Sequence, residues 1–185
     1  MKMLLERGDI NPNKPDKDGQ TPLSGAAQKG REGAVKILLE RGDVNPDKPD
    51  SDGQTSLCCA AGNGHEGVVR ILLRRGDVNS DEPDNYRQTP LWCAALNGHA
   101  GVVKMLLGRD GINPNEPDDD GQSPLYCASE NGHEGVVTVL LGRDDVNPNK
   151  PDSDSRTPLC YATERGHVGV IALLQPLESP TPSTT

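Results

Sequence analysis

Thr89-Pro-Leu-Trp-Cys-Ala-Ala-Leu-Asn-Gly-His99, followed by Val102-Val-Lys-Met-Leu-Leu107, decides the fold, because both stretches return along the chain at a constant interval. A Thr or Ser followed two residues later by Leu begins 34 residues apart five times, at Thr21, Thr55, Thr89, Ser123 and Thr157. Pairs of small residues and an aliphatic run keep the same spacing. Five near-copies without a gap indicate a solenoid, in which each unit packs on its neighbours.

Each unit is predicted to hold two short antiparallel helices and a long loop. Thr55 is a suitable N-cap, and the Pro that follows this position in the other copies suits the first helical turn. Gly64 can adopt the left-handed conformation that ends the first helix. The second helix runs through residues 68–73 and stops at Gly76. Neither helix is long enough to be stable alone, so stacking of the units must bury their apolar faces.

Composition alone would suggest a disordered chain. Of 185 residues, 32% are hydrophobic and 2% are aromatic, Phe is absent, and the formal net charge is −9. Such segments usually cannot bury enough apolar surface to fold. The periodic return of the apolar residues argues against disorder, since stacked units with small residues at their contacts need few large side chains.

The same composition excludes several classes of protein. The longest aliphatic run, residues 136–141, is far too short to span a bilayer, and residues 1–6 lack the apolar stretch of a secretion signal. The acidic balance disfavours a nucleic-acid partner, because phosphate binding needs clustered Lys and Arg. The odd number of cysteines, five, suits a reducing compartment, so we expect an intracellular protein, cytoplasmic or nuclear.

The repeated unit resembles the ankyrin repeat, whose signature is Thr-Pro-Leu-His-x-Ala, then Gly-His and an aliphatic second helix. The resemblance covers roughly residues 1–174 and is carried by five copies. It implies an all-α, ankyrin-repeat solenoid of stacked antiparallel helix pairs, here with long finger loops rich in Pro and Asp. The near-identical copies are also similar to arrays in large fungal recognition proteins of the nucleotide-binding-receptor type.

This chain departs from the ankyrin pattern in three ways. The motif histidine is replaced in every copy, so its hydrogen bonds must be missing or remade; the replacements are Ser24, Cys58, Trp92, Tyr126 and Cys160. The unit is one residue longer than usual, and its prolines predict weakly paired fingers rather than a hairpin ladder. Arg87 and Ser155 stand where other fingers have Gly, which predicts turns that are strained or differently shaped.

The repeat pattern divides the chain into three parts. Residues 1–9 align with residues 35–43, so residues 1–15 are interpreted as a partial repeat made of a second helix and its loop. Residues 16–174 form the array of five repeats, and residues 175–185 are expected to be a disordered tail. Since a solenoid normally begins with a polar cap, we interpret the chain as a fragment of a longer array.

Two rows of residues could suggest a metal or thiol site. His65, His99, His133 and His167 occur once per repeat, and stacked helices lie about 8–10 Å apart. One zinc ion needs all its ligands within about 2 Å, so these residues are expected to be structural. Cys59, Cys93 and Cys127 are likewise too far apart for disulfides. We expect no metal and no cofactor.

Two short motifs have a structural alternative. Arg-Gly-Asp at residues 7–9, 41–43 and 75–77 spells an adhesion tripeptide, but it also fits a last helical turn, a C-cap and the start of a loop. The Asp-rich segments ending at Gly53 and Gly121 resemble a calcium loop, yet Cys59 and Cys127 stand where that loop needs an acidic residue. No acid–base pair or phosphate-binding loop is present, and we expect no enzyme.

Charge is concentrated in the finger loops, which comprise residues 9–20, 43–54, 77–88, 110–122 and 144–156. Together these loops carry a net charge of −14, while the remainder of the chain carries +5. Because all fingers project from one edge of a solenoid, they should form an acidic comb. The comb either attracts a basic partner or only confers solubility.

The ankyrin resemblance implies that partners are held by finger tips and by the first-helix face on the concave side. At the positions where the copies differ most, the middle repeat is richest in aromatic and apolar residues, and aromatic residues surrounded by polar ones suggest an interface hot spot. The candidate partner-binding residues are Asp52, Tyr86, Gln88, Trp92, Leu96, Asn97, Asp119, Asp120, Gln122, Tyr126 and Asn131. For Trp92 the alternative is packing between repeats, since it replaces a motif histidine.

These observations predict a monomeric protein–protein interaction module that binds a protein partner, with a basic contact surface, through the concave face and the acidic fingers. Neither nucleic acid nor membrane is an expected partner. Two alternatives remain open at this point. One is a structural spacer or array segment of a larger receptor-like protein without a specific ligand, and the other is an engineered, consensus-like repeat scaffold.

Overall fold

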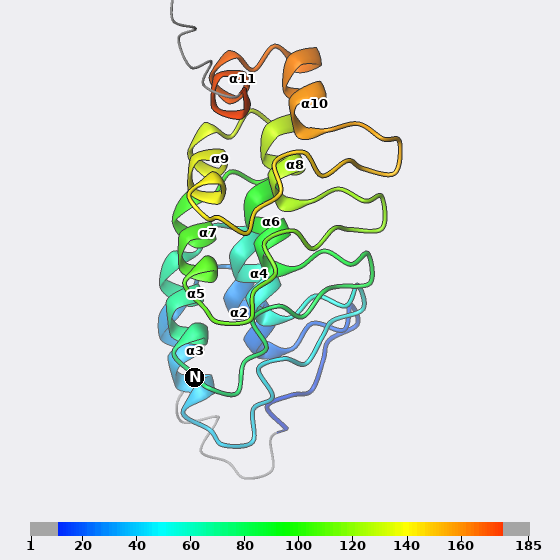
Figure 1. The fold of residues 1–185 in the computed structure, drawn as a ribbon. Coiled ribbons are helices and arrows are strands. Elements are labelled where there is room, and N and C mark those ends of the chain that lie inside the picture. The colour runs from blue at the N-terminus through cyan, green and yellow to red at the C-terminus, as the bar shows by residue number, and fades with distance from the viewer. Residues whose placement is uncertain (1–10, 176–185) are drawn as a thin grey trace, which may run out of the picture.

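The computed structural model describes residues 11–175, and within this range the chain forms ten helices in two layers (Figure 1). The first helices of the repeats form one layer: α2 (Pro22–Gln28), α4 (Ser56–Gly62), α6 (Pro90–Leu96), α8 (Pro124–Glu130) and α10 (Pro158–Arg165). The second helices form the other: α3 (Glu32–Leu39), α5 (Glu66–Leu73), α7 (Ala100–Leu107), α9 (Glu134–Leu141) and α11 (Val168–Leu174). The predicted all-α solenoid is confirmed. The expected helix within residues 1–9 and the tail beyond residue 175 lie outside the described residues.

The motif Thr or Ser begins every first helix. Its side chain accepts a hydrogen bond from the backbone N–H three residues on, as Thr55 does from Cys58 at 3.3 Å and Thr89 from Trp92 at 3.2 Å. Each first helix ends just before a left-handed glycine, such as Gly64 with φ of 70°. These local signals set the helix boundaries that the repeat predicts.

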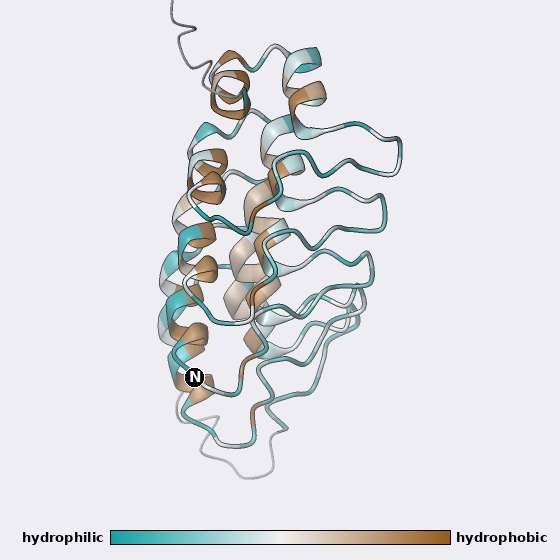
Figure 2. Ribbon diagram, in the orientation of Figure 1, coloured by the Kyte–Doolittle hydropathy of each residue, from teal (hydrophilic) through white to brown (hydrophobic). Residues whose placement is uncertain are grey.

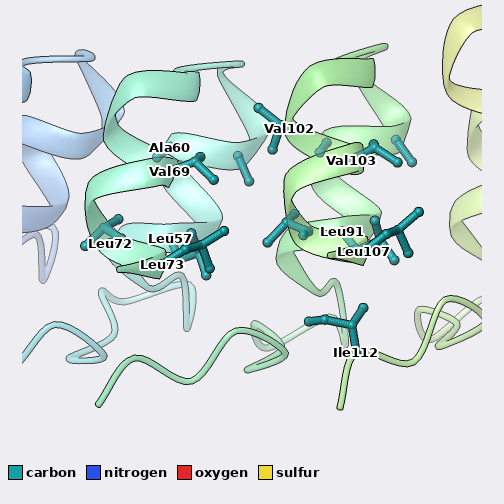
Figure 3. Packing of buried hydrophobic residues seen from close by; sticks show 14 of the residues in the cluster. Leu57, Ala60, Val69, Leu72, Leu73, Leu91, Val102, Val103, Leu107 and Ile112 are labelled. Atoms are coloured by element: carbon teal, nitrogen blue, oxygen red, sulfur yellow. The ribbon is translucent and has the colours of Figure 1, made fainter. Parts of the chain in front are cut away.

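The core lies between the two layers of helices. Leu57 and Leu91 from first helices pack against Val69, Val103 and their neighbours from second helices, and all four are buried (Figure 3). The alanine pairs of the first helices are also fully buried, which lets neighbouring first helices approach closely. Apolar residues face the space between the layers, while the finger loops are hydrophilic (Figure 2). Small side chains at the contacts therefore replace the large ones that the chain lacks.

The fingers project from the side of the first helices and contain no strand within residues 11–175. Each finger turn closes with two backbone hydrogen bonds, for example Asp50 N–H to Gln54 O and Gly53 N–H to Asp50 O, both at 3.1 Å. Neighbouring tips are joined by one backbone hydrogen bond each, such as Asn85 N–H to Asp52 O at 3.0 Å and Ser153 N–H to Asp120 O at 3.0 Å. The prediction of weakly paired fingers is confirmed.

The two fingers without a turn glycine keep the shape of the others. Arg87 has φ of 62° and Ser155 has φ of 64°, close to the 83° of Gly53 and the 79° of Gly121. Of the two expected outcomes, a strained turn and a different turn, the structure therefore shows the strained one.

The histidine row joins each repeat to the one before it. The Nε2 atom of His99 lies 3.1 Å from the carbonyl oxygen of Gly62, and His133 contacts the carbonyl oxygen of Leu96 at 2.9 Å. Each ring also packs on the preceding left-handed glycine, so a Cβ atom added to Gly64 would lie 2.5 Å from His99 Nδ1. These contacts confirm the structural role predicted for the histidines.

Candidate functional site

The first helices and the fingers together form one face of the molecule, here called the inner face. The candidate residues occupy three depths on it. Six are exposed, namely Asp52, Tyr86, Asn97, Asp119, Asp120 and Asn131. Gln88, Leu96 and Gln122 are half-buried, and Trp92 and Tyr126 are buried.

Trp92 and Tyr126 are not surface residues. The Trp92 side chain is 4% exposed, and its indole Nε1–H donates to Gln122 O at 2.9 Å. Tyr126 is 1% exposed and packs edge-on against Tyr161, with ring centroids 4.7 Å apart. Both residues hold the position of a motif histidine, and for Trp92 the burial agrees with the alternative of packing between repeats, while a partner-binding role of either residue stays a prediction. Tyr86, at 57% exposure, remains available at its finger tip.

Among the residues that replace the motif histidine, Ser24, Cys58 and Trp92 form new contacts, whereas Tyr126 Oη is buried without a hydrogen-bond partner among residues 11–175. Ser24 forms a capping box with Thr21, whose N–H donates to Ser24 Oγ at 2.9 Å. Cys58 contacts Glu82 O through its sulfur at 3.5 Å, and the indole N–H of Trp92 donates to Gln122 O in the next finger. The remade contacts are therefore partly local and partly between repeats.

A pocket of about 260 Å³ opens on the inner face between the second and third repeats, and we call it the Gly62 pocket. It is lined by Gln54, Cys58, Cys59, Gly62, Asn63, Gln88, Trp92, Cys93, Leu96 and Asn97. Four of the candidate residues, Gln88, Trp92, Leu96 and Asn97, are thus brought together. Asp119, Asp120, Gln122, Tyr126 and Asn131 belong to the next repeat and do not line it.

Gly62 was missed as a site residue, although the sequence carried the signal. The equivalent positions hold Gln28, Leu96, Glu130 and Glu164, so Gly62 is the one copy without a side chain there. A Cβ atom at Gly62 would lie 3.5 Å from Cys93 Cβ, in ordinary contact. A larger side chain would extend into the space that the pocket now leaves open.

The polar rim of the Gly62 pocket consists of carboxamides. The amide nitrogen of Asn63 donates to Cys59 O at 2.8 Å, and that of Asn97 donates to Cys93 O at 2.9 Å. These bonds fix both side chains on the helix ends and leave each Oδ1 without a donor among residues 11–175. No charged residue lines the pocket.

The cysteines of the inner face are protonated thiols. Burial raises the pKa of Cys58 to about 11 and that of Cys59 to about 12, and it raises the pKa of Cys93 and Cys127 further. All five cysteines are free. A protonated, buried thiol is a poor nucleophile and a poor metal ligand. Within residues 11–175, no three His, Cys, Asp or Glu side chains gather as a metal site would require.

The Arg-Gly-Asp motifs form ion pairs within the chain. Arg41 Nη2 lies 2.7 Å from Asp43 Oδ2, and Arg75 Nη2 lies 2.6 Å from Asp77 Oδ2. Hydrogen bonding to the arginine lowers the pKa of Asp43 and Asp77. Arg75 also donates to Leu39 O at 2.9 Å, at the end of the preceding second helix. The motif is therefore structural, but α3 and α5 have their C-caps at Glu40 and Arg74, so its arginine and glycine follow the helix and do not form its last turn and C-cap. Residues 7–9 lie outside the described range.

Comparison with known families agrees with the architecture. Residues 18–51 match the family described as Ankyrin repeat, and residues 42–118 and 110–181 match Ankyrin repeats (3 copies). The chain therefore belongs to the ankyrin repeat family, whose domains generally mediate protein–protein interaction and are typically non-catalytic. No curated protein matches the chain. None of the helices between residues 11 and 175 has the length and hydrophobicity needed to cross a bilayer.

Proposed function

We propose that this chain is a protein-binding module that holds a partner with a basic contact surface against its inner face. The observation that carries the proposal is the row of exposed finger-tip carboxylates, including Asp52, Asp119 and Asp120. Backbone hydrogen bonds between neighbouring tips hold these side chains along one edge. A row of like charges attracts an oppositely charged surface and speeds its association.

Three further candidate residues are proposed to contact the same partner. Tyr86 supplies an exposed aromatic ring among the acidic tips, and Gln122 and Asn131 supply polar groups on the next repeat. We infer a monomer without enzymatic activity that binds neither nucleic acid nor membrane. Five free thiols support an intracellular setting.

Matched charge removal on two faces tests the proposal. The first variant carries Asp52→Asn, Asp119→Asn and Asp120→Asn at the tips. The control carries Glu32→Gln, Glu66→Gln and Glu134→Gln, which neutralise the same number of exposed carboxylates at the starts of second helices. Proteins captured from a lysate by the parent chain should be lost by the tip variant and retained by the control.

Salt dependence supplies a second readout. Capture by the parent chain should weaken as the ionic strength rises from about 0.05 to 0.3 M, since exposed charges are screened over that range. If both triple variants and the parent capture the same proteins equally, the fingers take no part in binding. If none of the three captures a protein, the spacer alternative is favoured.

A further inference from the structure

We propose that the Gly62 pocket binds an arginine side chain presented by the partner. This inference rests on the proposed function and specifies which side chain the inner face selects. The pocket combines buried thiols and Leu96 at its walls with carboxamide oxygens at its rim. Such a lining suits a side chain with an aliphatic stem and a planar group carrying several donors.

The fifth repeat shows how the inner face accommodates a guanidinium. Arg156, at the position of Gln54, lies with its guanidinium carbon 4.3 Å from the centre of the Tyr161 ring. Its Nη1 donates to Tyr161 Oη at 2.8 Å, and its Nη2 pairs with Glu164, which holds the position of Gly62. The chain's own arginine thus covers this part of the fifth repeat.

A second arginine pairs with a glutamate between the fourth and fifth repeats. Arg165 Nη2 lies 3.0 Å from Glu130 Oε1, and Glu130 also holds the position of Gly62. At the Gly62 pocket itself neither an arginine nor an acidic side chain is present among the lining residues. The Gly62 pocket thus lacks the arginine–glutamate pairs that the chain forms at the corresponding glutamate positions of later repeats.

The electrostatics around the pocket favour a cation. Asp52 is exposed on the finger that carries Gln54, and Asp84 is buried with its Oδ2 atom lacking a hydrogen-bond partner among residues 11–175. Burial is the main reason that the pKa values of Cys58 and Cys93 are raised, and the negative charge of Asp84 adds to it. The negative charge of Asp84 therefore acts on Cys58 and on Cys93, which lie on the two repeats that line the pocket.

Arginine fits this setting better than lysine. An ammonium group is strongly hydrated, so its desolvation on entering a pocket costs more free energy. A guanidinium is weakly hydrated and presents five hydrogen-bond donors in one plane. The free Oδ1 atoms of Asn63 and Asn97 are two acceptors on neighbouring helices. The acidic fingers, in contrast, attract both residues equally, so the pocket alone should distinguish them.

Titration with hexa-arginine and hexa-lysine peptides tests the inference. Trp92 is the only tryptophan and lines the pocket, so its fluorescence reports occupancy, and calorimetry supplies an independent Kd. We expect the parent chain to bind hexa-arginine at least about tenfold more tightly than hexa-lysine, the gain of roughly one additional hydrogen bond to a charged group.

Two glycine variants locate that preference. Gly62→Leu introduces the residue that the next repeat has at this position, and Gly33→Leu is the control on an exposed second helix with open space around it. Gly62→Leu should reduce the ratio of the two Kd values to about one, with hexa-lysine binding unchanged, while Gly33→Leu keeps the parent ratio. Should Gly62→Leu unfold, Gly62→Ala, whose Cβ meets only ordinary contacts, is expected to lower the ratio in part.

The outcomes separate the pocket from the fingers. Equal, salt-sensitive binding of both peptides by the parent chain would overturn the arginine pocket and leave the proposed function standing. A preference for arginine that survives Gly62→Leu would also overturn it. Failure of both peptides to bind would count against the basic partner itself.

Discussion

At the base of each of the first four fingers, one side chain contacts the following loop. Asn115 does so completely, because its Oδ1 accepts from Asn147 N–H at 2.7 Å and its Nδ2 donates to Asp145 O at 2.6 Å. Asp47 occupies the same position and accepts from Asn79 N–H at 3.0 Å. A carboxylate has no donor for the second bond, and Asp47 Oδ1 is buried without a partner among residues 11–175.

Asp47→Asn should therefore stabilise the protein. The new amide would supply the missing donor, and we expect the free energy of unfolding at pH 7 to rise by about 1 kcal/mol. Urea denaturation followed by circular dichroism measures this change. Asp52→Asn is the control, because it removes the same charge from an exposed finger tip. An equal gain in the control would mean that general charge repulsion, and not the missing bond, is responsible.

The effect should depend on pH in a defined direction. Burial, aided by repulsion from Asp77 and Glu82, raises the pKa of Asp47 above its usual value. The favourable contribution of the protonated carboxyl is present below the unfolded pKa of about 3.9 and is lost as the pH rises through the folded pKa. The advantage of the Asn variant should accordingly be larger at pH 7 than near pH 3.5.

Ser155→Gly should relieve a strained turn. Ser155 has a left-handed φ of 64°, which costs about 1–2 kcal/mol for a residue with a Cβ atom. Part of the gain is offset by the greater flexibility of glycine in the unfolded chain, so we expect a net rise of about 0.5 kcal/mol. Ser153→Gly in the same finger lacks the positive φ and should lower stability slightly. Thermal unfolding of both variants distinguishes relief of strain from a general effect of glycine.

Between elements, the contact of each histidine with the preceding glycine joins one helix pair to the next. Gly64 and Gly166 have nearly the same φ, 70° and 73°. Only the first is covered by a ring, since a Cβ on Gly64 would lie 2.5 Å from His99 Nδ1 while a Cβ on Gly166 would meet nothing within 4 Å. The two positions therefore separate backbone strain from close packing.

Gly64→Ala should destabilise the protein much more than Gly166→Ala. Both substitutions introduce about 1 kcal/mol of strain, and Gly64→Ala must also displace His99 from Gly62 O. We expect a loss of about 3 kcal/mol at Gly64 against about 1 kcal/mol at Gly166, measured by urea denaturation. Combining Gly64→Ala with His99→Ala should remove most of the excess cost. Similar losses for both single variants would mean that the ring contact contributes little.

For the whole molecule, the acidic fingers should make stability depend on salt. Exposed carboxylates of one sign lie along one edge and repel one another, and added salt screens that repulsion. The melting temperature should rise as NaCl increases from about 20 to 300 mM. The variant with Asp52, Asp119 and Asp120 changed to Asn should show a smaller rise, whereas Glu32→Gln/Glu66→Gln/Glu134→Gln should behave as the parent. A melting temperature independent of salt would contradict this account.

The features that the sequence predicted correctly are those set by neighbouring residues. Thr55 caps its helix and Gly64 reverses the chain because these properties depend on only a few positions. The depth of a side chain depends instead on the next repeat. Trp92 is buried because it reaches Gln122, thirty residues on, and no local pattern indicates that contact. Gly62, in contrast, stands out in the sequence as the one copy without a side chain at its position, but the pocket beside it also depends on residues of the next repeat.

The hydrogen bonds that join neighbouring finger tips repeat from one finger to the next, so the row of tips has an approximate translational symmetry. A partner that matched two tips would match the following pair almost as well, so uniform fingers would attract a ligand without locating it along the array. Asn85-Tyr86, in place of the Ser51-Asp52 type of tip, and the missing side chain at Gly62 break that symmetry at one place. Making the copies identical should therefore preserve attraction but allow the partner to bind in several frames. For the partner proposed above, the irregular residues of the middle repeats would thus fix one position along the array.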